Sequence, residues 1–335
     1  MNILITGSAG FIGYHLSKRL INEQYKIIGV DNLNNYYDVG LKKARLNNLL
    51  KYDNFEFYQY DIEDNNNIQE LFEKYQFDTV IHLAAQAGVR YSLKNPWSYI
   101  NSNIVGLLSI LESCRSNPVK HLIFASSSSV YGANRKIPFS EHDNVDHPVS
   151  LYAATKKSGE LISHTYSHLF NIPITCLRFF TVYGPWGRPD MAYYKFTKNI
   201  LEDKEIEVYN NGRMRRDFTY IDDVVEAIVK LIYNIPVPNK NWNDKNLDPS
   251  SSFAPYKVYN IGNNKPVNLL DFIAVLERII GKKAKKKFLP MQPGDVIETY
   301  ADITELEKVV GYRPKTSIVE GLRKFVEWYD WYSRR

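Results

Sequence analysis

The strongest constraint on the fold is an alternation of short apolar runs with longer amphipathic stretches through the first 180 residues. The apolar runs predict strands and the amphipathic stretches predict helices. The predicted strands are 2–6, 25–31, 55–61, 78–85, 121–127 and 172–179, and the predicted helices lie near 11–23, 37–50, 64–74, 97–116 and 150–170. This alternation predicts right-handed crossovers and an α/β fold with a doubly wound parallel Rossmann sheet. The strands are rich in Val, Ile, Leu and Phe, as expected when helices cover both faces.

The alternation stops after residue 180. The segment 183–191 is rich in turn formers, and 234–255 reads as a long polar loop. The C-terminal third therefore predicts a smaller mixed α/β region. The expected division is a Rossmann domain of residues 1–180, onto which 214–235 packs back, and a second domain of residues 181–213 and 236–335.

Charge and cysteine content exclude several classes of protein. The chain has 42 Lys and Arg against 37 Asp and Glu, a net charge of +5, which suits a small anionic ligand but is too weak to indicate nucleic acid. Cys114 and Cys176 sit in apolar surroundings and predict buried free thiols of a reducing compartment. The N-terminus has no signal pattern and no apolar span reaches membrane length, so we expect a cytoplasmic protein that binds no membrane.

A glycine-rich turn follows the first strand directly. In "TGSAGFIG", Gly7, Gly10 and Gly13 are spaced so that backbone N–H groups can approach a pyrophosphate at the start of a helix. The alternative is a tight turn that only closes a strand–helix pair. Asp31, at the end of the second strand, can hydrogen-bond both adenosine ribose hydroxyls and would repel a 2′-phosphate. The predicted cofactor is therefore NAD rather than NADP.

Further cofactor contacts are expected at neighbouring strand ends. Asp61 is placed to meet the adenine, although a helix N-cap is an equally good interpretation. The other predicted cofactor-binding residues, in the glycine turn, at strand ends and in the helix near 97–116, are Phe11, Ile12, Asn32, Ile62, Leu83, Ala84, Ala85 and Asn103.

A Tyr-x-x-x-Lys pair places a phenol and an ammonium on one helix face, where the lysine can lower the tyrosine pKa. The spacing occurs at Tyr14/Lys18, Tyr152/Lys156 and Tyr194/Lys198. Of the three tyrosines, only Tyr152 follows a strand that ends in hydroxyls, in the run "FASSSSVYG" of residues 124–132. Tyr152 and Lys156 are the predicted catalytic pair, and they also count among the cofactor contacts.

These motifs together resemble the extended short-chain dehydrogenase/reductase family. Four further stretches, "AGVRYSLKNP", "RFFTVYGPWGRPDM", "RRDFTYIDD" and "QPGDVIETYAD", are similar to those of NAD-dependent nucleotide-sugar epimerases, most closely UDP-glucuronate 4-epimerases. The resemblance covers essentially the whole chain. It implies a triad of Ser127, Tyr152 and Lys156, a role in carbohydrate metabolism and polysaccharide biosynthesis, and a homodimer joined through the helices near 97–116 and 150–170. It implies that residues 1–180 bind NAD, that the second domain binds a UDP-sugar, and that no metal takes part.

The residues after Ser127 distinguish reactions within the resembling enzymes. The 4,6-dehydratases carry an Asp-Glu pair there and the UDP-glucuronate decarboxylases usually a nearby glutamate, whereas this chain has Ser128 and Ser129. A serine hydroxyl is no acid or base near neutral pH. We therefore expect C4 epimerisation of UDP-glucuronate to UDP-galacturonate through a transient 4-keto sugar. The alternatives are an epimerase of neutral UDP-hexoses, a decarboxylase, or a non-catalytic NAD sensor.

The uronate carboxylate needs partners, because a 4-keto uronic acid is a β-keto acid that loses CO₂ when its carboxylate is misoriented. The predicted partners are Ser128, Ser129, Thr181 and Arg188. UDP-galactose epimerases have asparagine at the place of Thr181. The alternative for Arg188 is an ordinary surface arginine.

The UDP moiety has its own predicted contacts. Arg216 should meet the pyrophosphate, Asp295 the uridine ribose, and Arg90 a phosphate or the carboxylate. Some UDP-galactose epimerases have arginine where this chain has Gln292, so phosphate binding should depend more on Arg216 and Arg90.

Overall fold

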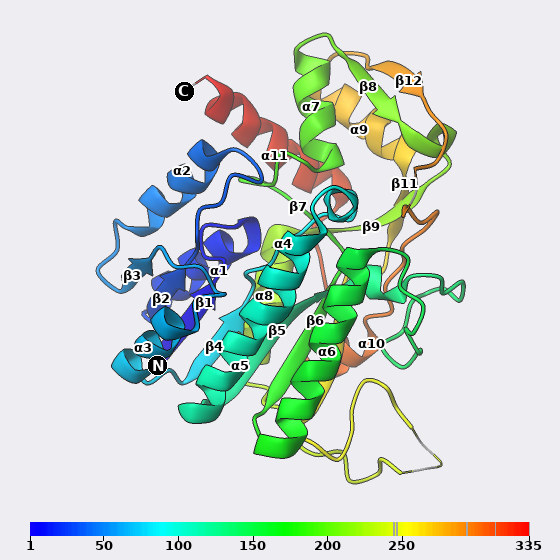
Figure 1. The fold of residues 1–335 in the computed structure, drawn as a ribbon. Coiled ribbons are helices and arrows are strands. Elements are labelled where there is room, and N and C mark those ends of the chain that lie inside the picture. The colour runs from blue at the N-terminus through cyan, green and yellow to red at the C-terminus, as the bar shows by residue number, and fades with distance from the viewer. Residues whose placement is uncertain (244, 246, 293, 312, 335) are drawn as a thin grey trace.

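The computed structural model describes residues 1–243, 245, 247–292, 294–311 and 313–334. Its centre is a seven-stranded parallel sheet in the order β10-β6-β5-β4-β1-β2-β3 (Figure 1). The strands are β1 (Asn2–Thr6), β2 (Lys26–Val30), β3 (Phe55–Tyr58), β4 (Thr79–His82), β5 (His121–Ser127), β6 (Ile174–Phe179) and β10 (Tyr256–Ile261). The winding direction reverses between β1 and β4, which opens a crevice at the carboxyl ends of the strands. The predicted doubly wound α/β fold is confirmed.

Helices cover both faces of this sheet (Figure 1). One layer contains α1 (Phe11–Asn22), α2 (Val39–Leu49) and α8 (Ile221–Ile232), and the other contains α3 (Asn65–Tyr75), α5 (Gly106–Ser116) and α6 (Leu151–Phe170). Successive residues of β1 point to opposite faces. Ile3 and Ile5 pack in the core with α1 and α8, whereas Leu4 packs with α3 and α5. Burial on both sides explains why Ile3, Leu4 and Ile5 are all apolar rather than alternating with polar residues.

A smaller lobe lies beyond the carboxyl ends of the central strands (Figure 1). Its strands are β7 (Thr181–Tyr183), β9 (Arg215–Tyr220) and β11 (Pro266–Asn268) in one sheet and β8 (Glu205–Val208) with β12 (Lys285–Phe288) in another. Its helices include α7 (Ala192–Leu201), α9 (Leu269–Ile280) and α11 (Ile318–Ser333), while α10 (Thr304–Val310) lies near β10.

The structure differs from the expected elements in several places. The range 236–335 was assigned to the second domain, yet β10, which lies inside it, pairs in parallel with β6 and completes the central sheet. The predicted strand 55–61 ends at Tyr58.

Helix α8 packs against α1, where Glu226 forms an ion pair with Arg19 at 3.0 Å. The division into two domains stays a prediction. Within the described residues, no helix is long and apolar enough to cross a membrane.

Candidate active site

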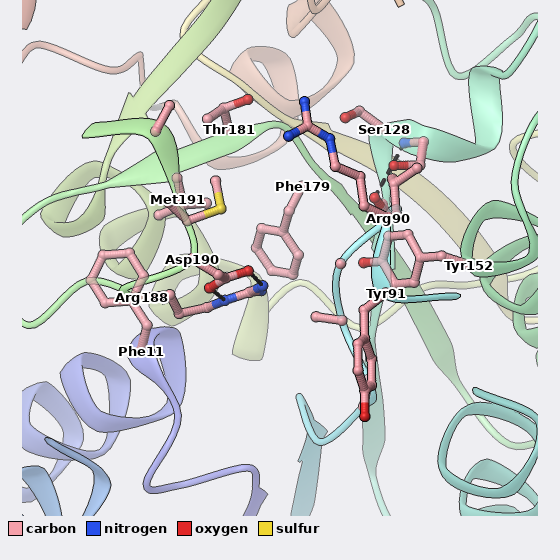
Figure 2. A pocket seen from close by; sticks show the side chains of 18 of the residues that line it. Phe11, Arg90, Tyr91, Ser128, Tyr152, Phe179, Thr181, Arg188, Asp190 and Met191 are labelled. Atoms are coloured by element: carbon pink, nitrogen blue, oxygen red, sulfur yellow. Dashed lines mark hydrogen bonds and ion pairs between the residues drawn. The ribbon is translucent and has the colours of Figure 1, made fainter. Parts of the chain in front are cut away.

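A cavity of about 1090 Å³ lies between the central sheet and the smaller lobe (Figure 2). It extends from the glycine turn after β1 to the lobe residues around β8 and β12. The cavity is lined by all three predicted catalytic residues, by every predicted substrate-binding residue, and by the predicted cofactor residues except Asp61 and Asn103. The fold therefore gathers segments that are up to about 290 residues apart, from Gly7 to Asp295, around one space.

The glycine turn is shaped for a close approach to its neighbours. Gly7 has a φ of +72°, and a Cβ there would lie 2.8 Å from the backbone N of Ala84. A Cβ on Gly13 would lie 2.1 Å from the carbonyl oxygen of Gly7. Gly10 precedes the first residue of α1, so the positive end of that helix faces the cavity. This geometry fits the pyrophosphate of a dinucleotide.

Asp31 lies at the end of β2, beside this turn. Its carboxylate accepts hydrogen bonds from the backbone N of Ala9 at 3.2 Å and of Leu33 at 2.9 Å. Burial raises its pKa, and these hydrogen bonds and the nearby Lys42 oppose that rise. Each carboxylate oxygen keeps a lone pair for a ribose hydroxyl. Lys42 also lines the cavity and was not predicted; its only signal was its place in the segment after the second strand.

Asp61 lies at the rim rather than in the cavity wall. Its carboxylate accepts a hydrogen bond from the Asn32 side chain at 3.1 Å and is exposed. The N-cap interpretation of Asp61 is wrong, because α3 begins four residues later and Asp64 caps it. A contact between Asp61 and the adenine stays a prediction.

Asn103 supports the cavity wall without lining it. The predicted helix 97–116 consists of α4 (Pro96–Ile100), a π-helical turn (Asn101–Val105) and α5. The Asn103 amide, in the π-helical turn, bonds the backbone N and O of Gln86 at 2.8 and 3.1 Å and the Thr155 hydroxyl at 3.0 Å. Its hydrogen-bonding groups are therefore used by the protein, so the structure favours a positioning residue over a direct cofactor contact.

The predicted catalytic residues meet at the end of β5. Ser127 is the last residue of that strand, and Tyr152 and Lys156 lie one turn apart on α6. Ser127 lies near enough to the Tyr152 phenol to lower its pKa, and the Lys156 ammonium donates to the carbonyl oxygen of Ala125 at 2.8 Å. Figure 2 shows Tyr152 pointing into the cavity. Tyr14 and Tyr194, the other candidates, do not line it.

The expected depression of the tyrosine pKa does not occur in this structure. Burial raises the pKa of Tyr152, although the Ser127 hydrogen bond and the charge of Arg188 oppose the rise. Burial also lowers the pKa of Lys156 to about 7. Both shifts have one cause, because removal from water disfavours the charged form of each group.

Arg188 is paired inside the cavity wall. Its guanidinium contacts the Asp190 carboxylate through two nitrogens, at 3.0 and 2.5 Å (Figure 2). The Tyr36 hydroxyl donates to the same carboxylate at 3.2 Å. Asp190 and Tyr36 line the cavity and were not predicted. Asp190 had a signal in its place two residues after Arg188, whereas only folding brings Tyr36, in the loop after β2, against the turn after β7. Ser128, Ser129 and Thr181 offer hydroxyls in the same cavity.

The other end of the cavity holds the predicted UDP contacts. Arg90 forms an ion pair with Asp295 at 2.9 Å and lies over the Tyr209 ring at 4.6 Å. Arg216 donates to three backbone carbonyl oxygens, at 2.6 to 3.0 Å. Because Arg90 and Arg216 both have protein partners in this structure, a bound pyrophosphate would exchange some of these hydrogen bonds for its own. Among the described residues, no group of three or more His, Cys, Asp or Glu is arranged to hold a metal ion.

Comparisons with known proteins agree with this geometry. A probable UDP-glucuronate 4-epimerase of Rhizobium meliloti is 48% identical over 100% of this chain and 98% of its own length. Protein CapI of Staphylococcus aureus is 56% identical over 100% of both chains. A crystal structure of UDP-glucuronic acid 4-epimerase from Bacillus cereus, in complex with UDP-glucuronic acid and NAD, superposes with a TM-score of 0.88 at 36% identity, covering 99% of this chain and 100% of that one. Residues 3–244 match the model of the NAD dependent epimerase/dehydratase family. The chain belongs to the NAD dependent epimerase/dehydratase family.

Proposed function

We propose that this chain interconverts UDP-glucuronate and UDP-galacturonate by NAD-dependent epimerisation at C4. The observation that carries the proposal is one cavity in which Ser127, Tyr152 and Lys156 share a wall with the hydroxyls of Ser128, Ser129 and Thr181. The trio suits oxidation and reduction of an alcohol. The neighbouring hydroxyls suit a uronate and cannot provide the acid–base pair that elimination requires. The names of the Rhizobium and Bacillus relatives support the same reaction.

The chain's residues handle the proton of the sugar 4-hydroxyl. NAD, when bound, supplies a hydride acceptor at C4 and afterwards the hydride donor. The Tyr152 phenolate takes the hydroxyl proton and returns it after the 4-keto sugar has turned over, while Ser127 donates a hydrogen bond to the sugar oxygen. Because burial raises the pKa of Tyr152, its phenolate needs a neighbouring cation. Arg188 already lowers the pKa of Tyr152, and Lys156, one turn along α6, is placed to add a second positive charge, although burial lowers its own pKa to about 7.

The carboxylate of the sugar is held by hydroxyls and by a compensated cation. Ser128, Ser129 and Thr181 can donate hydrogen bonds to it. Arg188 brings a positive charge whose field is largely balanced by Asp190. A carboxylate with fixed hydrogen-bond partners cannot rotate freely, so the bond to its carbon is kept away from the orientation that releases CO₂. These four residues stay proposed contacts, as do Arg216, Arg90 and Asp295 at the UDP end.

An assay with a panel of UDP-sugars and no added NAD tests the proposal. UDP-glucuronate should yield UDP-galacturonate, measured by liquid chromatography and mass spectrometry, because the cofactor is regenerated in every cycle. Conversion of UDP-glucose with none of UDP-glucuronate would instead indicate an epimerase of neutral hexoses. Release of a UDP-pentose as the main product would indicate a decarboxylase.

We also propose a homodimer joined through α4, α5 and α6. These helices expose large apolar side chains, among them Trp97 at 74% and Leu161 at 57% exposed, and α5 and α6 lie side by side on one face (Figure 1). Exposed apolar side chains on neighbouring helices favour association. Leu161→Arg should give a monomer in light scattering.

The buried free thiols Cys114 and Cys176 support a cytoplasmic location, where the product would serve polysaccharide biosynthesis.

A further inference from the structure

Arg45, on α2, is fully buried and lies outside the trio and the proposed sugar contacts. Its hydrogen-bond partners among the described residues are carbonyl oxygens and a phenol rather than a carboxylate. A buried guanidinium with neutral partners is costly unless its N–H groups are well satisfied, because its charge has left water. The position of the partners of Arg45 indicates what role could offset this cost.

The partners of Arg45 come from three segments around the predicted NAD site. The guanidinium donates to the carbonyl oxygen of Ala9 in the glycine turn at 2.9 Å and to the Tyr37 hydroxyl in the loop after β2 at 2.7 Å. It also donates to the carbonyl oxygens of Trp186, at 3.0 and 2.5 Å, and of Gly187, at 3.3 Å. One side chain therefore joins the glycine turn after β1 and the loop after β2 to the turn of the smaller lobe that carries Arg188.

That lobe turn is held in an unusual conformation. Trp186 has a φ of +61°, which is rare for a bulky residue and persists only when its surroundings enforce it. Its ring packs against Tyr14 of α1 at 5.4 Å and against Trp328 of α11 at 5.4 Å between ring centroids. His15 of α1 bonds the preceding carbonyl oxygen, of Pro185, at 2.9 Å. The turn is thus fixed to α1 and α11 as well as to Arg45.

We propose that Arg45 is a clamp that sets the residence time of NAD by tying the lobe turn to the cofactor loops. The inference rests on the proposed function, in which the sugar gives up its C4 hydride and regains it in a later step. Departure of the cofactor between those steps would leave the sugar oxidised. The clamp holds the two walls of the site together, so the cofactor leaves only after several hydrogen bonds have been broken together. Arg45 is a positioning residue and touches no reacting atom.

The test measures exchange of bound cofactor. Wild-type protein and variants loaded with NAD are mixed with excess isotope-labelled NAD, and bound label is followed by mass spectrometry. Arg45→Met should exchange about tenfold faster or more, since even one lost hydrogen bond of about 1.4 kcal/mol gives that factor. Arg45→Lys, which keeps the charge and some donors, should be intermediate. Tyr37→Phe, which removes one partner, should show a smaller acceleration and decides the matter if Arg45→Met is insoluble.

A stability control separates clamping from general loosening. Leu276→Ala opens the core of the smaller lobe at a fully buried position on α9, a helix that provides no hydrogen-bond partner of Arg45, and should lower Tm while leaving NAD exchange at the wild-type rate. The clamp is refuted if the soluble Arg45 and Tyr37 variants exchange no faster than wild type, or if Leu276→Ala exchanges as fast as they do. Wild-type protein that cannot be loaded with NAD would refute the proposed function together with the clamp, whereas loaded variants with unchanged exchange overturn the clamp alone.

Discussion

The cofactor end and the sugar end of the cavity are built from different materials. At the cofactor end, the wall is largely backbone: a glycine turn with a φ of +72° at Gly7, a helix that begins at Phe11, and the ends of parallel strands. At the sugar end, the wall is made of side chains such as Ser127, Tyr152 and Arg188, contributed by segments that meet only in the folded chain.

This difference predicts which kind of substitution should damage each end of the cavity. A backbone wall depends on the absence of side chains, so adding one methyl group should damage it, whereas a side-chain wall depends on particular functional groups, so removing one should damage it. The four predictions below test this contrast, from the largest expected effect to the smallest.

Tyr152→Phe should reduce kcat by at least about 100-fold, because it removes the proposed proton-transfer group and keeps the ring. Bound NAD should stay at the wild-type level, since the cofactor end is untouched. The matched control is Tyr194→Phe, which alters the same sequence motif at a residue packed against Phe325 and Tyr329, outside the cavity. Steady-state kinetics and the nucleotide content of the purified protein give both answers. A large loss of kcat in Tyr194→Phe together with a small loss in Tyr152→Phe would contradict the choice of Tyr152 as the catalytic tyrosine.

Arg188→Met should weaken binding of UDP-glucuronate by about 10–150-fold, the range for a lost charged hydrogen bond of about 1.5–3 kcal/mol. UDP-glucose, which has no carboxylate, should bind nearly as well as before. Calorimetric titration of both sugars measures the difference, and mass spectrometry should detect some UDP-pentose from the less restrained carboxylate. Equally weakened binding of UDP-glucuronate and UDP-glucose would show that Arg188 acts only through the part of the cavity wall that it forms with Asp190.

Gly13→Ala should weaken NAD binding by about tenfold or more, because its Cβ would lie 2.1 Å from the Gly7 carbonyl oxygen and the turn would have to shift. Gly281→Ala is the control. Its φ of +76° makes alanine unfavourable by about 1 kcal/mol, yet within the described residues the added Cβ would have no atom within 4 Å outside the adjoining backbone. Only the first variant should lose NAD during gel filtration. Full retention of NAD by a folded Gly13→Ala protein would break the contrast between the two ends.

Ser127→Ala should shift the rising limb of the kcat–pH profile to higher pH. The Ser127 hydrogen bond lowers the pKa of Tyr152, so its loss raises that pKa and a higher pH is needed to form the phenolate. Ser126→Ala is the matched control, because that hydroxyl donates to the buried Glu160 at 2.6 Å instead. An unchanged limb in Ser127→Ala, or an equal shift in both variants, would show that Ser127 does not tune the phenol.

The sequence predicted best those features that depend on nearby residues. The doubly wound sheet follows from the alternation of strands and helices, and the glycine turn with Asp31 follows from one strand–turn–helix unit. The spacing of Tyr152 and Lys156 already places them on one helix face. The sequence predicted less well the features that depend on distant segments or on exact element ends. The strand β10 joins the central sheet from a segment that was expected in the second domain, and Asp64 rather than Asp61 caps α3.

By itself, the sequence determined the fold class and the cofactor and proposed the reacting groups, because periodicity, glycine spacing and residue chemistry are local properties. The tertiary structure alone decided which charges balance one another and how burial shifts their pKa values. Tyr36 meets the Arg188–Asp190 pair, and Arg45 meets three separate segments, only after the smaller lobe has packed against the sheet. The pKa of Lys156 falls to about 7 because folding removes its ammonium from water, a change that no local pattern of residues encodes.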